Sequence, residues 1–210
     1  MEIGEPALCA TKLDRRIVLS LFSMTLVAPG LGRAQQTQQA GTVTDMRGEA
    51  FAEARNERRV LEPSAPLFIK DMVGTGSDAR LTMHLGADTT LHLGQLARLT
   101  IDQFLVNAGG DLTLEAGSIL FDSPPGRLSP LQIHTAFGLI AVRGTRFFAG
   151  PSNGVFGVFV ERGSVAVSAA GVQVVVEEGQ GTNISRPGDP PTPPAPWGVP
   201  RISAAMKSVQ

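Results

Sequence analysis

The stretch that decides the fold runs from Ile133 to Ala149 and reads I-H-T-A-F-G-L-I-A-V-R-G-T-R-F-F-A. Two apolar runs, Leu139–Val142 and Phe147–Ala149, flank the tetrad Arg143-Gly144-Thr145-Arg146. A charged tetrad inside an apolar run fits no helix face, and Gly within a strand usually marks a bulge or the close approach of another segment. The stretch therefore predicts a strand that is broken at the tetrad.

Strand-like runs continue on both sides of this stretch. Many alternate apolar with polar or small residues, as in Leu81-Thr82-Met83-His84-Leu85, so one face of each strand is expected to be buried. The pattern predicts an all-β fold with many short antiparallel strands, arranged as a two-sheet sandwich or a roll-like β-solenoid. Periodicity alone does not separate an open roll from a closed barrel. The expected strands are Thr42–Met46, Glu49–Ala54, Arg80–Leu85, Thr90–Leu93, Ala97–Ile101, Asp111–Glu115, Ser118–Phe121, Leu131–His134, Leu139–Val142, Arg146–Ala149, Val155–Val160, Ser164–Ser168 and Val172–Val176.

The composition supports a β-rich chain and excludes some classes of partner. Aromatic residues make up 5% of the 210 residues, with no Tyr and one Trp, while 24 Gly and 15 Pro interrupt the apolar runs. The formal net charge is −1, which gives no electrostatic reason to bind nucleic acid. The single cysteine, Cys9, lies in the N-terminal segment that we expect to be removed, so the mature chain has no thiol or disulfide.

Residues 1–34 have the features of an export signal. A basic region that includes Arg15-Arg16 precedes the apolar stretch Ile17–Leu26, and small residues stand at the end of the segment. The apolar stretch is shorter than the about 20 residues that span a bilayer, so no stable membrane insertion of the mature chain is expected. We predict a mature N-terminus near Gln35 and a periplasmic or secreted protein. The adjacent arginines leave ordinary secretory and twin-arginine export as alternatives.

The rest of the chain divides by composition. Residues 35–40 are a polar linker, and residues 41–184 form the β domain. Residues 185–210 are rich in proline, cannot build a core, and are predicted to be a disordered tail. Trp197, in this tail, is expected either to lie in solvent or to pin the tail to the domain or a partner.

The sequence offers no clear catalytic or metal-binding set. His84, His92 and His134 alternate with apolar residues and should point outward, although a cupin-like metal enzyme would also be all-β. The glycine-rich pieces lack the Lys and helix of a phosphate-binding loop. We therefore predict no enzyme, no catalytic, cofactor-binding or metal-binding residues, and no cofactor.

The candidate site residues come from the broken strand: Arg143, Gly144, Thr145 and Phe147. In a structural role, Gly144 would permit a bulge, the Thr145 hydroxyl would bond a freed backbone group, and Arg143 would pair with a carboxylate or cap loop carbonyls. In a functional role, the same residues would contact a partner. The sequence leaves both roles open.

Five ordered motifs resemble the FecR domain, the periplasmic β-rich sensor module of iron-dicitrate-type regulators. The segment Ala141–Phe147 matches the hallmark V-R-G-T-x-F, and Asp71–Leu81 is similar to G-D-x-I-x-T-G-x-x-S-R-v. The other three are Gly41-Thr42-Val43, Asp111–Gly117 and Val160–Val165. The resemblance covers Gly41 to about Asn183.

The resemblance implies a non-enzymatic module of the cell envelope. Regulatory members also carry a cytoplasmic anti-sigma region and a membrane helix, and we expect here a stand-alone form without that region. The first hypothesis is an exported binding or sensor module for a protein or an envelope polymer. The second is the periplasmic component of a transmembrane signalling system that acts in trans with a separate membrane partner.

Overall fold

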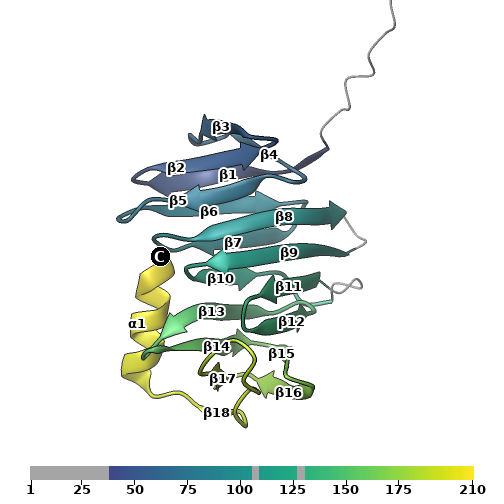
Figure 1. Ribbon diagram of the computed structural model, residues 1–210, viewed down its shortest axis with the longest axis vertical. Helices are drawn as coiled ribbons and strands as arrows, with labels where there is room; N and C mark the ends of the chain where they lie inside the picture. The colour runs from purple at the N-terminus through teal and green to yellow at the C-terminus, as the bar shows by residue number, and fades with distance from the viewer. Residues whose placement is uncertain (1–37, 106–108, 127–130) are drawn as a thin grey trace, which may run out of the picture. The chain divides into compact units, whose positions relative to one another are not determined.

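Alternating apolar residues build two β-sheets that share one core. The computed structural model describes residues 38–105, 109–126 and 131–210, which form two nine-stranded sheets and one helix (Figure 1). Sheet A has the order β18 (Ala195–Pro196), β17 (Gln180–Ile184), β14 (Val155–Arg162), β13 (Arg146–Ser152), β10 (Ile119–Asp122), β7 (Thr89–Leu93), β6 (Arg80–Leu85), β1 (Gln39–Arg47) and β4 (Pro66–Phe68). Sheet B has the order β16 (Val172–Glu177), β15 (Ser164–Ala169), β12 (Gly138–Val142), β11 (Leu131–Thr135), β9 (Gly109–Ala116), β8 (Arg98–Leu105), β5 (Met72–Thr75), β2 (Ala50–Ala54) and β3 (Glu57–Val60).

The chain passes back and forth between the two sheets as it advances. Hairpins alternate along the sequence, with β6–β7 in sheet A, β8–β9 in sheet B, β13–β14 in sheet A and β15–β16 in sheet B. Neighbouring strands are antiparallel except for the parallel pair β9–β11. Both sheets begin near β3 and β4 and end near β16 and β18, as Figure 1 shows. The predicted all-β, roll-like arrangement of two sheets is confirmed, and it is open, not a closed barrel.

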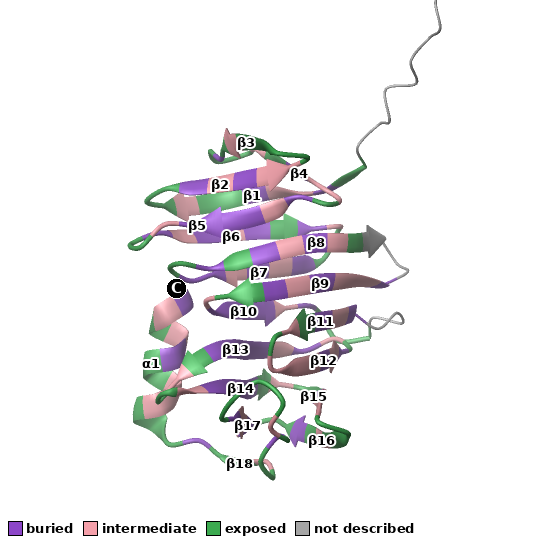
Figure 2. Ribbon diagram, viewed as in Figure 1, coloured by how far each residue is buried: buried purple, intermediate pink, exposed green. Residues whose placement is uncertain are grey.

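The inter-sheet core consists of the side chains that alternate inward from both sheets. In β6, Leu81, Met83 and Leu85 are buried, whereas the residues between them are partly or fully exposed (Figure 2). The same period of two repeats in β7, β9 and β15. Burial of these apolar side chains is the main stabilising contribution of such a fold.

The prediction of a disordered tail is wrong for residues 185–210. This segment contains β18 and the helix α1 (Val199–Val209), and α1 lies on the outer face of sheet A beside β10 and β13 (Figure 1). Buried side chains of the tail and of sheet A form a second core, made of Leu120, Phe148, Phe159, Trp197, Ala205 and Val209. A proline-rich segment cannot build a core alone, but it can fold against an apolar surface that the sheet already presents.

Trp197 holds the tail against the domain, which is one of the alternatives that the sequence leaves open. Its ring stacks on Phe159 with 5.3 Å between centroids, and the guanidinium of Arg201 lies 3.5 Å from the indole centroid. The indole lies over two glycines of sheet A, Gly157 and Gly181, where a Cβ would come within 2.7 and 2.3 Å of Trp197 atoms. The sheet surface therefore has a slot that fits this ring.

The remaining domain predictions fall at the N-terminus. The expected signal, residues 1–34, and the first part of the linker lie outside the described residues. Strand β1 begins at Gln39, two residues before the predicted start of the β domain. Among the residues that are described, no helix has the length and apolar character needed to cross a bilayer.

Candidate functional site

The predicted break in the strand is the corner where the chain passes from sheet B to sheet A. Strand β12 ends at Val142 and β13 begins at Arg146, and the two strands belong to different sheets. Gly144, in the corner, has φ +65°, and a Cβ there would lie 2.9 Å from the carbonyl oxygen of Pro124. Gly144 therefore has a left-handed backbone and a closely approaching segment, the second of which was one of the two alternatives expected from the sequence.

The other predicted site residues divide between the interior and the surface. Phe147 is fully buried in the inter-sheet core, with its ring centroid 5.4 Å from that of Phe121. Thr145 is also buried, and its carbonyl accepts a hydrogen bond of 3.0 Å from the Ser123 amide. Within the described part of the chain the Thr145 hydroxyl has no hydrogen-bond partner, so the backbone bond expected of it is not found. Arg143 is exposed at the corner.

Arg146, which the sequence did not single out, organises a charged network on the outer face of sheet A. Its Nη1 donates to Asp122 Oδ2 at 2.6 Å, and its Nε donates to Glu161 Oε2 at 2.5 Å. Arg162 Nη2 donates to the second oxygen of Asp122 at 2.8 Å and to the Ser123 carbonyl at 3.0 Å. Asp122 is thus held between two guanidinium groups.

The charges of this network stabilise one another in their ionised forms. Partial burial alone would raise the pKa of Asp122, but hydrogen bonds and charge from Arg146 and Arg162 outweigh it, so the pKa lies below its ordinary value. Burial opposes ionisation of Arg146 as well, yet its bonds to Glu161 and Asp122 raise its pKa. The network therefore keeps its charge pattern at neutral pH.

The network is one end of a row of polar side chains that crosses six strands, here called the polar row. Because directly paired residues face the same side of a sheet, successive pairs place these side chains in line on the outer face. The polar row consists of Thr42 on β1, His84 on β6, Thr90 on β7, Asp122 on β10, Arg146 on β13 and Arg162 on β14. Five steps of about 4.8 Å give it a length of about 24 Å.

His92 lies beside the polar row, next to the second core. Its Nδ1 is 3.0 Å from the Thr82 hydroxyl, and its directly paired neighbour on β10 is Leu120. Burial and the charge of Arg146 lower the pKa of His92, so the neutral imidazole is favoured. The outer face of sheet A therefore has two halves, a polar one along the row and an apolar one beneath α1.

This arrangement suits recognition by hydrogen bonds and fixed charges. The described residues include no cluster of three or more His, Cys, Asp or Glu side chains that could hold a metal ion. His84 and His134 are exposed, on sheets A and B respectively, as their alternation predicted.

Comparisons with known proteins connect this region to one family. The family model described as FecR protein matches residues 71–166, which contain the corner, the charged network and five of the six residues of the polar row. No curated protein matches the chain.

Two crystal structures of a "putative anti-sigma factor" from Parabacteroides distasonis share the fold. Each has a TM-score of 0.54 and 13% sequence identity, over 64% of this chain. The match spans 64% of the length of one of these solved chains and 63% of the other. At this identity the likeness concerns the fold alone. The motif resemblance is confirmed by the family match: the protein carries a FecR domain, matched over residues 71–166.

Proposed function

We propose that this protein is an exported, non-enzymatic binding module of the bacterial cell envelope, and that the polar row is its contact surface. The observation that carries the proposal is the row itself. Its charged end is held by ion pairs, and its other half contains the exposed His84 between the half-buried Thr42 and Thr90. Pre-organised polar groups lose little conformational entropy when a ligand binds. The ligand is a protein or an envelope polymer.

The shape of the surface favours an extended ligand. The polar row lies on a sheet face and runs across strands β1 to β14 without a change of side. Its residues offer donors and acceptors at the regular spacing of the strands. A polysaccharide or peptide chain lying along the row would meet a new polar group at each step.

The test is capture of the ligand from envelope extracts by the wild-type protein and two matched double variants. His84→Ala with Thr90→Ala removes two directly paired residues of the row and leaves the charged network intact. His134→Ala with Thr113→Ala removes the same residue types from a directly paired position on sheet B. We expect the first variant to lose the captured partner and the control to keep it, with both unfolding near the wild-type temperature. Equal capture by all three proteins would overturn the assignment of the row.

A signalling role is the second candidate. The fold shared with solved structures of a "putative anti-sigma factor" supports it, and the protein would then act in trans with a separate membrane component. The same capture experiment separates the two candidates by mass spectrometry and glycan analysis. Polymer fragments, or an envelope protein other than an inner-membrane regulator, support the first candidate, and an inner-membrane regulator supports the second. Stoichiometric metal in the purified protein would contradict a non-enzymatic role and favour a cupin-like enzyme.

A further inference from the structure

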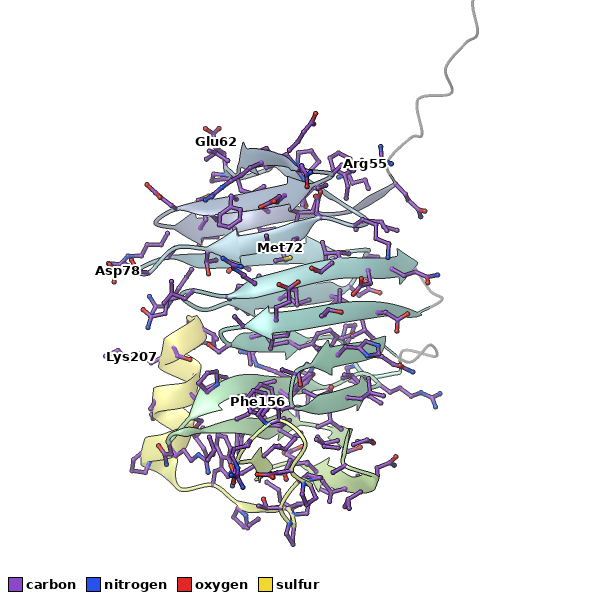
Figure 3. The ribbon with its side chains drawn as sticks, in the orientation of Figure 1. Arg55, Glu62, Met72, Asp78, Phe156 and Lys207 are labelled. Carbon is purple, nitrogen blue, oxygen red and sulfur yellow. The ribbon has the colours of Figure 1, made fainter. Side chains whose placement is uncertain are left out.

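Sheet B ends in two open edge strands at opposite ends of the fold. Among the described residues, β3 pairs only with β2 and β16 pairs only with β15, so each leaves one row of backbone amides and carbonyls without a strand partner in sheet B. Arg55 and Glu62, labelled in Figure 3, mark the end that carries β3. An open edge is a template for pairing with another chain.

These two edges expose apolar side chains as well as backbone. Among the described residues five large hydrophobic side chains are exposed, and three of them lie on β3 and β16. Val60 on β3 is 78% exposed, and Val172 and Val175 on β16 are 44% and 50% exposed. Burial of such side chains against a partner strand would stabilise an association.

The strand directions suit the addition of one copy to the end of another. Between β16 and β3 the sheet has seven antiparallel pairings and one parallel pairing, so β16 and β3 run in opposite directions. A second copy in the same orientation would therefore place its β3 antiparallel to β16. Sheet B of one copy would continue into sheet B of the next.

One register of this junction matches both apolar groups and charges. Arg58 and Val60 pair with Glu53 and Phe51 of β2, while the intervening Ala52 faces the core, so both edge residues face the outer side of the sheet. Val175 and Glu177 also face outward, because Val176 between them is buried in the core. When Val60 lies opposite Val175, Arg58 lies opposite Glu177.

Glu57 would come near Glu178 in the same register. Glu178 follows the end of β16, in an exposed turn. Solvent and salt screen such an exposed pair, so it opposes the junction only weakly.

We propose that copies of this protein associate head to tail, with β3 of one copy extending sheet B of the next at β16. The two contact surfaces are different, so the contact is heterologous and does not close at a dimer. Repetition of the same step gives open linear assemblies. The surface is separate from the polar row, which lies on sheet A.

The test is sedimentation velocity of the purified protein over a concentration series, with charge-reversal variants. We expect the sedimentation coefficient of the wild type to rise with concentration. Arg58→Glu or Glu177→Arg alone should weaken association several-fold, because each replaces an opposite-charge pair with like charges directly opposite one another. An equimolar mixture of the two variants should assemble again, since copies that alternate along the assembly bring opposite charges together at every junction.

The mixture separates a lost contact from a lost fold, because a misfolded variant is not rescued by its complement. Asp88→Arg, in the exposed turn between β6 and β7, is the charge-reversal control and should assemble like the wild type. Monomers at every concentration would overturn the proposal. A dimer that is abolished by Val175→Lys and unaffected by Val60→Lys would also overturn it, in favour of symmetric pairing through β16.

Discussion

The inter-sheet core and the second core beneath α1 are built from different sequence patterns. The first uses every second residue of a strand, so each strand contributes one face. The second uses the residues in between: Leu120 and Phe148 face α1, whereas Phe121 and Phe147 on the same two strands face the inter-sheet core. Strands β10 and β13 are therefore buried on both faces. A strand that loses its alternation shows that something covers its outer side.

The inter-sheet core should dominate stability, and Phe147→Ala tests this with the largest expected effect. Phe147 is fully buried between the sheets, and removal of such a ring costs about 3–5 kcal/mol, because it leaves a cavity. Equilibrium denaturation followed by far-ultraviolet circular dichroism measures the loss. Leu96→Ala, at a position that is 60% exposed, should change the free energy of unfolding by about 0.5 kcal/mol or less. A Phe147→Ala protein as stable as this control would contradict the prediction.

Substitutions at the corner between the sheets test the backbone conformation there, not the packing of a buried ring. Gly144→Val places a β-branched residue at φ +65°, where its Cβ would meet backbone atoms of residues 124–126 that cannot rotate away. The expected loss is about 3 kcal/mol, at the upper end of the range for backbone strain. Arg143→Ala, at the exposed position before it, should cost less. Equilibrium denaturation of both variants shows which loses more free energy of unfolding. A Gly144→Val protein as stable as the wild type would show that the corner is an ordinary extended segment.

A substitution beneath the Trp197 ring should weaken the second core without changing the inter-sheet core. In Gly157→Ala the new Cβ lies 2.7 Å from the indole, but it meets side chains of the tail that can shift, so the expected loss is only about 1 kcal/mol. Trp197 is the single tryptophan of the sequence, so its fluorescence reports on this site. We expect a red shift and faster proteolysis within residues 185–195. Gly76→Ala, where a Cβ has its nearest neighbour at 3.5 Å, is the control and should show neither change.

The same comparison shows what the sequence could predict. Alternation in runs such as Leu81–Leu85 was sufficient for the inter-sheet core, because the period of two fixes which face is buried. The proline content of the tail predicts a segment without a core and does not reveal its helix. The consecutive apolar runs Ile119–Phe121 and Phe147–Ala149 carry the missing signal, because both faces of such strands need a cover.

The charged network could be predicted only in part. Its central residue, Arg146, is inside the recognised motif, but its partners Asp122 and Glu161 are 24 and 15 residues away in sequence. Their meeting depends on the register of β10, β13 and β14, which local patterns do not determine. Gly144 can be predicted from the sequence because its requirement is local, a backbone conformation that favours glycine.

The smallest expected effect lies at the boundary between the polar row and the second core, where His92 faces both. Burial and the charge of Arg146 lower its pKa, with His84 acting in the same direction and Asp122 opposing. The unfolded chain therefore binds a proton more readily than the folded one, so this contribution to stability is complete above about pH 6.5 and declines as the pH falls below that value. The free energy of unfolding should thus decrease between pH 7 and 5, and His92→Gln should reduce the slope.

Denaturation at several pH values measures that slope in the wild type and the variant. Thr90→Val, on the same face, removes no titrating group and should keep the wild-type slope. Asp122 affects stability in a separate pH range, because its pKa is lowered from 3.8. The stability that it contributes is present above pH 3.8 and is lost only as the pH falls through the lower pKa of the folded state. If His92→Gln leaves the slope between pH 7 and 5 unchanged, this imidazole titrates alike in the folded and unfolded chain. The boundary of the second core would then not exclude water from His92.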